Sequence, residues 1–407
     1  MQKKCKHCDK ELKFKLINLG KQPYANSLSY KKKKINKYPL EVYICDYCAL
    51  AQQTYAIKSK VIFSRYSYYS SYSNNMLRIA KNFCNEIKKK YLKKNSFVLE
   101  IASNDGYLLK NFKNQNIKIL GVEPAKNIAK LCRKLGIETI NDFFTKKLSY
   151  KIIKKYGYPD FIIANNVIAH IPDLIDFFSG LRVIINKKNY LSVEFQYFLN
   201  LVRSCQFDTV YHEHFYYYSV KSIQNILHSF NLKIVKIESI NTHGGSLRLL
   251  IADKNNILKE DSSIEKYIKN ETKNKIHNKR YLNKFKIRAK KIKLDLLKFL
   301  DKAKKNNKII IGFGAAAKTT VLLNYLGKKY VKNIKLIIDD TKYKQNKFVP
   351  GVNIKIKSRE ALNHIKADYI IIFPWNHINE IIKKFNSNII KYSKFVIAIP
   401  KLKIFSY

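Results

Sequence analysis

The pattern of hydrophobic and polar positions centres on residues 97–101, where a short apolar strand is interrupted only by one glutamate. An Asn-Asp-Gly turn at 104–106 follows this strand, and a helical run over 107–112 comes next. A second strand, 117–122, ends in Glu123, where a carboxylate can accept hydrogen bonds from ribose hydroxyls. This pattern favours a cofactor that contains a nucleoside. An ordinary βαβ turn, with Glu123 as a solvated strand end, remains the alternative.

Strands and helices continue to alternate toward the middle of the chain. It predicts these further elements: helices at 128–135 and up to 185, the latter with Pro172 in its first turn, and strands at 138–140, 160–164 and 190–195. Repeated units of this length predict a doubly wound parallel sheet. The strands at 232–238 and 246–252 have a connection too short for a crossover helix, so we expect an antiparallel hairpin at the sheet edge.

A lysine-rich stretch over 256–307 has apolar residues at helical spacing and predicts a long helical connector. An α/β pattern then restarts, with strands at 308–313, 335–338 and 369–373, so a second Rossmann-like domain is expected. The small-residue turn after the first of these strands opens a helix near Lys318, a suitable place for an anion. It is not a P-loop, because only two glycines are present and the GKS/T spacing is absent.

Two CxxC pairs near the N-terminus indicate a metal site. Cys5 and Cys8 form the first pair, and Cys45 and Cys48 form the second. Four thiolates at this spacing complete a tetrahedral zinc shell, which makes the site structural. The spacer is longer than usual, and a redox CxxC is the alternative. Metal binding would supply much of the folding free energy of so small a domain.

The length and composition set the boundaries of the interpretation. A chain of 407 residues is longer than a single hydrophobic core usually supports. We expect a zinc-binding domain over 1–74, a central domain over 75–255, and a helical connector with the Rossmann-like domain over 256–407. The formal charge is +50, but the excess lysine is scattered along the chain. Nucleic-acid recognition favours localised arginine-rich patches, so we expect no nucleic-acid partner.

The same composition bears on the location of the protein. No long apolar run and no signal-like amino terminus is present, so the sequence predicts a cytoplasmic protein without a membrane partner. The total of seven cysteines is odd, which argues against a disulfide framework.

Two aromatic segments carry further candidate chemistry. Residues 62–73 combine tyrosines and serines that could line a polar pocket, although an aromatic packing seam gives the same composition. Residues 207–218 place two histidines on either side of a glutamate, with tyrosines around them. The HxH spacing does not fit a catalytic metal pair on a helix, so proton transfer is the better interpretation. A hydrogen-bonded polar core cluster is the alternative.

Taken in order, the motifs resemble those of the nucleotide-sugar C-methyltransferases. The similarity covers essentially the whole chain and is carried by CKHC, CDYC, YSYYSSYS, LEIASNDGYLL, GVEPAKNIA, ANNVIAHI, FDTVYHEHFYYYS, HGGSLR, GFGAAAKTT, VPGV and PWNHINE. Such enzymes have three domains and use S-adenosylmethionine (SAM) to methylate a carbon of a ketosugar attached to a nucleoside diphosphate. Departures from the family pattern are mild, namely Phe313 where a tyrosine is frequent and Pro374 before the WN pair.

The resemblance implies roles for particular residues. It assigns structural zinc to the four paired cysteines. The cofactor residues that it implies are Glu100, Ala102, Asn104, Gly106, Tyr107, Glu123, Pro124, Asn127, Asn165 and Asn166. The implied catalytic residues are His214 as the base, with Tyr211, Glu213 and His170 in the same cleft, and one of Tyr66 and Tyr68. The implied substrate-binding residues are His243, Lys318 and Asn376.

The implied chemistry is proton abstraction beside a ketone, followed by attack of the resulting carbanion on the methyl group of SAM. Three other functions would use parts of the same sequence: a sugar O-methyltransferase, a zinc-containing RNA methyltransferase or nucleic-acid-binding protein, and a catalytically silent subunit. The nucleobase, the sugar, the methylated carbon and the oligomeric state do not follow from the sequence, and a monomer is one option.

Overall fold

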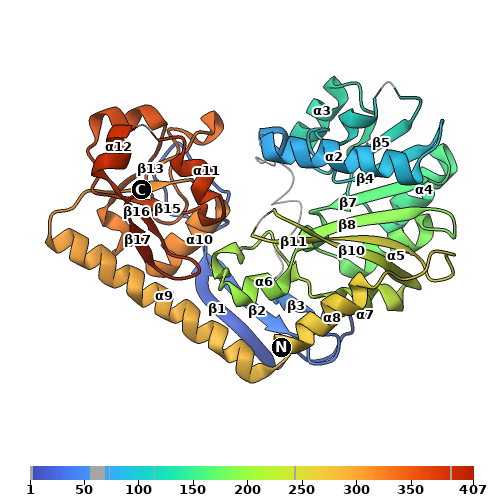
Figure 1. Cartoon of the computed structure of the whole chain (residues 1–407), viewed down its shortest axis with the longest axis horizontal. Coiled ribbons are helices and arrows are strands. Elements are labelled where there is room, and N and C mark those ends of the chain that lie inside the picture. The colour runs from blue at the N-terminus through green and yellow to red at the C-terminus, as the bar shows by residue number, and fades with distance from the viewer. Residues whose placement is uncertain (1–2, 56–68, 73, 114, 243, 386) are drawn as a thin grey trace.

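A computed structural model gives the fold of the chain (Figure 1). The residues that it describes are 3–55, 69–72, 74–113, 115–242, 244–385 and 387–407. The predicted site residues Tyr66, Tyr68 and His243 lie outside the described residues. Among the described residues, no helix has both the length and the apolar composition needed to cross a bilayer.

The first of three sheets in the described chain is antiparallel and belongs mainly to the N-terminal part. Its strands run in the order β1 (Phe14–Gln22), β2 (Tyr38–Ile44), β3 (Ala51–Gln53) and β9 (Tyr216–Tyr217). The last strand comes from the middle of the sequence, from the segment that contains the two candidate histidines. The N-terminal sheet is therefore completed by the segment that carries the candidate catalytic residues.

The central sheet has the order β10-β11-β8-β7-β4-β5-β6. Its strands are β4 (Phe97–Ile101), β5 (Lys118–Val122), β6 (Thr139–Ile140), β7 (Phe161–Asn165), β8 (Tyr190–Gln196), β10 (Leu232–Ile240) and β11 (Ser246–Asp253). Strands β4, β5, β6, β7 and β8 are parallel to one another, whereas β11 is antiparallel to both β8 and β10. The predicted doubly wound sheet with an antiparallel hairpin at one edge is confirmed.

Helices connect these strands. They are α2 (Asn74–Tyr91), α3 (Lys126–Lys134), α4 (Lys146–Tyr156), α5 (Leu174–Ile184), α6 (Phe198–Arg203) and α7 (Val220–Ser229). Central β4 is buried at every position, which explains its nearly continuous apolar sequence. Strand β4 is therefore an inner strand of the sheet. Ligands of such sheets bind at the loops that follow the carboxyl ends of the parallel strands.

The expected helix over 107–112 is wrong, because the structure has only a 3-10 turn at Leu109–Phe112. The Asn111 side chain donates hydrogen bonds to the carbonyl oxygens of Tyr107 and Leu108 at 3.2 and 2.8 Å. In a continuing α-helix these carbonyls would accept hydrogen bonds from backbone N–H groups four residues later. The Asn111 side chain competes for them, and the helical turn ends after Phe112.

Two other expectations about helices need correction. Pro172 is not in the first turn of α5, because Asp173 is the N-cap and accepts a hydrogen bond from the Asp176 N–H. The single helical connector is instead two helices, α8 (Ser263–Lys273) and α9 (Lys279–Lys305). Asn278 starts the second one, because its side chain accepts hydrogen bonds from the first backbone N–H groups.

The third sheet is mostly parallel, in the order β14-β13-β12-β15-β16-β17. Its strands are β12 (Ile310–Phe313), β13 (Ile334–Ile338), β14 (Ile356–Lys357), β15 (Tyr369–Ile372), β16 (Lys394–Ile397) and β17 (Lys403–Phe405). Its helices are α10 (Ala317–Leu326), α11 (Ile378–Ile382) and α12 (Ser387–Tyr392). The expected Rossmann-like arrangement is therefore present.

The N-terminal sheet lies between the two α/β units (Figure 1). Strand β1 packs against α9 and α10, and the Thr320 hydroxyl donates a hydrogen bond to the carbonyl oxygen of Ala25 at 2.9 Å. A β-bridge joins Ser29 to Phe348. The long α9 leads along the base of the molecule to the C-terminal unit.

Candidate active site and metal centre

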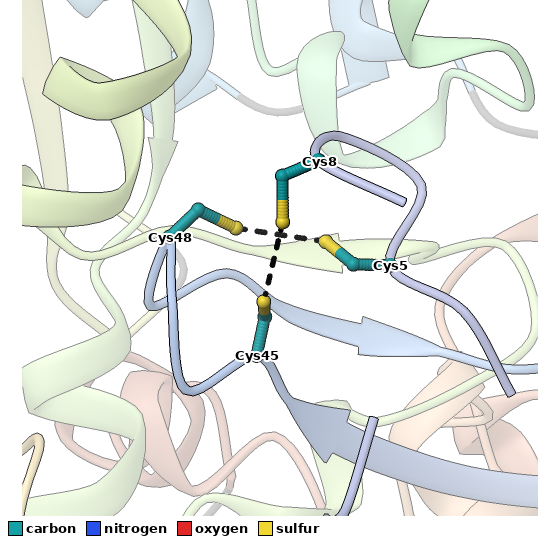
Figure 2. A group of neighbouring side chains, drawn as sticks. All are labelled: Cys5, Cys8, Cys45 and Cys48. Carbon is teal, nitrogen blue, oxygen red and sulfur yellow. Dashed lines mark hydrogen bonds between the residues drawn. The ribbon is translucent and has the colours of Figure 1, made fainter. Parts of the chain in front are cut away.

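The four paired cysteines come together, as Figure 2 shows. Their sulfur atoms all lie within 4.8 Å of one another, and the Cys5–Cys48 and Cys8–Cys45 sulfur pairs are each 3.5 Å apart. A tetrahedral zinc shell with Zn–S distances of about 2.3 Å needs separations of about 3.8 Å, so the donor set fits zinc. The Gln52 amide donates a hydrogen bond to Cys5 Sγ at 3.1 Å. Such a bond orients a ligand and stabilises its thiolate.

The loop after β4 contains three residues in the left-handed backbone region. Ala102 and Asn104 have positive φ angles of 55° and 48°, and Gly106 has 78°. For a residue such as Ala102 this conformation costs roughly 1 kcal/mol or more, so the surrounding structure must hold it in place. A Cβ on Gly106 would lie 2.8 Å from Ile137 Cδ1, so this glycine is required by packing and backbone angle rather than by ligand approach.

Two buried carboxylates stand at the ends of β4 and β5, where a bound nucleoside would lie. Glu123 accepts hydrogen bonds from the backbone N–H groups of Asn104 and Ala125 at 3.0 and 2.8 Å. Burial raises the pKa of Glu123 to about 7, although these two donors favour its ionised form. Burial also raises the pKa of Glu100 well above its usual value, and its Oε2 is buried without a described partner.

The other predicted cofactor residues lie around the same sheet edge. Asn165, at the end of β7, accepts a hydrogen bond from the Ser192 hydroxyl at 2.9 Å. Asn166 has a positive φ of 59° and donates to Glu194 Oε1 at 3.1 Å. The remaining predicted residues, Tyr107, Pro124 and Asn127, follow β4 and β5 in the chain. The cofactor assignments remain predictions, but the buried acidic and amide groups suit a ligand with hydroxyl and amino groups.

One turn carries the candidate base and its neighbour. The His214 N–H donates to the Tyr211 carbonyl oxygen at 2.9 Å, which closes a four-residue turn. The Tyr211 hydroxyl and His214 Nε2 are 2.8 Å apart, and their ring centroids are 4.0 Å apart. The structure therefore brings these two predicted residues together as a hydrogen-bonded pair.

The hydrogen bonds of His214 indicate its tautomer. Its Nδ1 lies 3.0 Å from the Thr209 carbonyl oxygen. A carbonyl oxygen can only accept, so Nδ1 carries the hydrogen and Nε2 of the neutral ring accepts from the Tyr211 hydroxyl. The nitrogen that can take a proton is thus the one that faces Tyr211.

His170 lies against this pair. Its ring centroid is 4.8 Å from that of His214, and its Nδ1 is 2.8 Å from the Glu213 carbonyl oxygen. The Phe215 N–H donates to the carbonyl oxygen of Ala169 at 2.7 Å. His170 follows β7 by only a few residues. These bonds therefore join the turn to the carboxyl end of the parallel strands, where the candidate cofactor residues lie.

The side chain of Glu213 bonds away from the histidine pair and toward the N-terminal part of the chain. Its Oε1 accepts a hydrogen bond from the Asn26 amide at 3.1 Å, and its Oε2 is buried without a described partner. Burial raises the pKa of Glu213. The backbone carbonyl, not the carboxyl group, is therefore the part of Glu213 that contacts His170.

Two predicted substrate-binding residues of the C-terminal unit also come together. Lys318 Nζ donates to Asn376 Oδ1 at 2.8 Å and lies 4.5 Å from the centroid of the Trp375 ring. The Trp375 indole N–H donates to Asp208 Oδ2 at 2.9 Å. Burial raises the pKa of Asp208 to about 6, although the Lys318 charge and the indole hydrogen bond favour the ionised form.

A cavity of about 440 Å³ lies where the central and C-terminal units meet. It is lined by α2, by the β10–β11 connection with Arg248, and by the Asn376–Glu380 segment. Arg248 is almost fully buried and forms an ion pair with Glu194 at 2.8 Å. Asn376 thus lines this cavity and also accepts the hydrogen bond from Lys318.

Several residues of the site were not expected to act there. Gln53, Asn26 and Thr209 all bond to the Tyr211–His214 turn, and Trp375 and Asp208 connect that segment to the C-terminal unit. Gln53 and Tyr211 are 158 positions apart, so periodicity gives no signal for their contact. Asp208 and Trp375 were visible as parts of motifs, but nothing in their spacing indicates that they pair.

Comparison with protein families divides the chain into three matched regions. Residues 5–63 match a family described as "Putative zinc binding domain", residues 72–237 match "Methyltransferase domain", and residues 241–400 match "C-methyltransferase C-terminal domain". All four clustered cysteines lie in the first region, and the Tyr211–His214 turn lies in the second.

One curated relative aligns with nearly the whole chain. The chain is 26% identical over 407 residues to the C-methyltransferase NovU of Streptomyces niveus, an alignment covering 99% of this chain and 96% of that protein.

Two solved structures are similar to less than half of the chain. A SAM-dependent methyltransferase from Archaeoglobus fulgidus has a TM-score of 0.36 and 16% identity, covering 44% of this chain and 94% of its own. The magnesium protoporphyrin IX methyltransferase of Synechocystis PCC 6803, solved with bound SAM, has a TM-score of 0.33 and 10% identity, covering 44% and 79%. With such low scores, neither structure bears on the substrate.

Proposed function

This chain belongs to the SAM-dependent C-methyltransferases, and we propose that it methylates a carbon of a ketosugar carried on a nucleoside diphosphate. The three matched regions and the full-length similarity to a C-methyltransferase support transfer to carbon. A ketosugar substrate would give the enzyme a place in deoxysugar biosynthesis.

The observation that carries the proposal is the Tyr211–His214 pair. Methylation at carbon requires a base, because the carbon must lose a hydrogen before it can attack. The Thr209 carbonyl holds the hydrogen of His214 on Nδ1, so Nε2 is left as the basic nitrogen. An imidazole can exchange protons near neutral pH, which suits a general base.

In the proposed reaction, His214 Nε2 takes the hydrogen of the carbon beside the ketone as a proton. The electron pair of the broken C–H bond moves into an enolate. When bound, SAM supplies an electrophilic methyl group, so the new C–C bond forms as the methyl–sulfur bond breaks. The proton on Nε2 then leaves to solvent, which returns His214 to its neutral form.

In this proposal Tyr211 and His170 would stabilise the enolate oxygen. The Tyr211 hydroxyl donates to Nε2 in the resting pair, and once Nε2 is protonated this hydrogen can be donated to the enolate instead. His170 donates its Nδ1 hydrogen to the Glu213 carbonyl, so its Nε2 would donate to the enolate only from the protonated ring. Preorganised donors of this kind typically contribute a factor of about 100 or more to the rate.

Lys318 and Asn376 are proposed to bind the diphosphate. Lys318 is in the first turn of α10, where backbone N–H groups favour an anion. Desolvation lowers the pKa of Lys318, so a phosphate that contacts it would stabilise its charged form. The sugar would then extend from Lys318 and Asn376 toward the Tyr211–His214 turn. The Trp375–Asp208 hydrogen bond connects the C-terminal unit to the segment that carries this turn.

Mass spectrometry of reaction products tests the proposal. The purified protein would be incubated with SAM and a panel of nucleoside-diphosphate ketohexoses, and the position of any added methyl group determined. We expect one methyl group on carbon, and no product from the corresponding sugars whose ketone has been reduced to an alcohol. Methylation of those alcohols on oxygen would instead make the chain a sugar O-methyltransferase.

A further inference from the structure

Strand β3 contacts the metal centre with one glutamine and the candidate catalytic turn with the next. We propose that Gln53 is a positioning residue that holds the Tyr211–His214 turn in its reactive conformation, and that Gln52 fixes β3 to the metal centre. The inference rests on the proposed role of His214 as the base.

The contacts of Gln53 are confined to the turn and the strand beside it. Its amide nitrogen donates to the carbonyl oxygens of Tyr211 at 2.7 Å and His214 at 2.6 Å. An amide NH₂ has two hydrogens, and both are used here. Both acceptors are carbonyls, so the nitrogen rather than the oxygen of the amide must face them.

These acceptors are the first and fourth residues of the same turn. The Tyr211 carbonyl also accepts the His214 N–H, which is the bond that closes the turn. Gln53 therefore bridges the two ends of the turn from outside, and its own backbone N–H donates to the Phe215 carbonyl at 2.9 Å. Loss of the amide would leave a buried His214 carbonyl without this donor and would allow the turn to open.

Gln52 lies on the opposite face of β3, because successive side chains of a strand alternate. Its Nε2 donates to Cys5 Sγ at 3.1 Å, and its Oε1 accepts the Lys6 N–H at 2.8 Å. Both bonds are to the segment that carries Cys5 and Cys8. The short strand thus connects the metal centre to the turn through adjacent residues, with no flexible segment between them.

Other parts of the N-terminal domain contact the remaining residues of the turn. His212 Nε2 lies 3.3 Å from the Pro39 carbonyl oxygen, and its ring packs edge-on against Tyr24. The Asn26 amide donates to Glu213. Every residue of the turn therefore contacts the N-terminal domain, and Gln53 bonds to the backbone carbonyls of both members of the candidate catalytic pair.

The test compares Gln53→Met with the unchanged protein. Methionine nearly matches glutamine in size but has no donor. Long-range ¹H–¹⁵N spectra of the histidine rings should show His214 as the Nδ1–H tautomer in the unchanged protein and as a mixture in the variant. Turnover of the ketosugar should fall at least about 10-fold, because misplacing a reacting group by about 1 Å can cost 100-fold. The KM for SAM should stay within about twofold, because the amide does not bond to the cofactor loop.

Two controls separate positioning from general damage. Gln22→Met removes another buried glutamine of the same sheet, whose amide donates only to the Leu19 carbonyl in the described structure, and should change neither the spectrum nor turnover. Gln52→Met should speed zinc release to a chelator, with the His214 spectrum changing only once zinc is lost.

A single His214 tautomer with turnover near that of the unchanged protein in Gln53→Met would overturn the proposal. If that variant does not fold, Gln53→Asn keeps the amide on a side chain shorter by one methylene and is measured in the same way. Activity retained by His214→Asn would disprove the assigned base, but the Gln53→Met spectrum would still report on the turn. The two proposals can therefore fail separately.

Discussion

At the scale of single residues, the proposed reaction depends on one nitrogen atom, His214 Nε2. His214→Asn removes this base, so we expect turnover to fall by at least about 100-fold, the usual contribution of general base catalysis. The affinity for SAM should remain nearly unchanged, because the candidate cofactor residues lie on other loops. Steady-state kinetics and calorimetric titration with SAM measure the two quantities.

His228→Asn is a suitable control for that variant, because His228 is exposed near the end of α7 and has no predicted role. It should leave turnover unchanged. If His214→Asn keeps more than about a tenth of the activity, a far smaller loss than general base catalysis implies, the base is a different residue.

Glu123 gives the site a predicted pH dependence. Burial raises its pKa to about 7, so the folded protein without SAM holds a proton on Glu123 at lower pH. Ribose hydroxyls donate to the ionised carboxylate and would lower this pKa again. The affinity for SAM should therefore rise as the pH increases through about 7, and below that value it should fall roughly tenfold per pH unit.

Titration calorimetry from pH 6 to 8, in buffers that differ in ionisation enthalpy, measures both the affinity and the proton released. Glu123→Gln cannot ionise and should bind SAM more weakly with a flatter pH dependence. The stability of the protein without SAM should change with pH in the opposite direction to the SAM affinity. The contribution of Glu123 to the free energy of unfolding should decrease as the pH rises from 4.5 toward 7, because only the folded state retains the proton in this range.

At the scale of structural elements, the sequence predicted what local pattern controls. The short apolar strands, the parallel central sheet and the edge hairpin follow from periodicity and connection length, and two CxxC pairs indicated the metal cluster directly. Helix ends were less predictable. The Asn111 side chain ends a helix after one turn, and this depends on a rotamer rather than on spacing.

The same limit applies to the candidate site. The histidine and tyrosine of the candidate turn were recognisable as residue types, but the hydrogen bonds that hold this turn come from Gln53, Asn26 and Thr209. The first two lie on a domain far away in sequence, and a single sequence carries no signal for such long-range pairs. The sequence could indicate candidate residues for the site, but not the contacts that hold them.

The loops of the C-terminal unit depend on Gly314, which leads to α10. Its φ is 89°, and a Cβ there would lie 2.3 Å from Pro374 Cγ, a ring that cannot rotate away. Gly314→Ala should therefore cost about 2–4 kcal/mol, combining the left-handed backbone with overpacking. It should also weaken nucleotide binding, because Pro374 precedes Trp375 and Asn376. Thermal unfolding and titration with a nucleoside diphosphate measure these effects.

Gly20→Ala is the matched control for the backbone term. Gly20 also has a positive φ, 75°, but a Cβ there would have no atom within 4 Å. Its cost should be about 1–2 kcal/mol, with no effect on nucleotide binding. Equal losses for the two variants would show that contact with Pro374 is unimportant.

At the scale of the whole molecule, the N-terminal sheet is the common support of the other two units. It is extended by β9 from the central part, it packs on α9 and α10, and it is bridged to Phe348 of the C-terminal unit. His7, in the first cysteine pair, lies 3.0 Å from the Ser229 hydroxyl at the end of α7. A change at the metal centre should therefore not remain local.

Zinc removal tests this view. Small zinc domains take much of their folding free energy from the metal, so a strong chelator should unfold the N-terminal sheet. Because that sheet supports the catalytic turn and both α/β units, we expect calorimetry to show the main transition shifted to lower temperature, and SAM to stabilise the zinc-free protein less than the zinc-loaded one. If the N-terminal domain were only an appendage, chelation would remove a small separate transition and leave the stabilisation by SAM intact. The size of the SAM effect after chelation therefore distinguishes a supporting domain from an independent one.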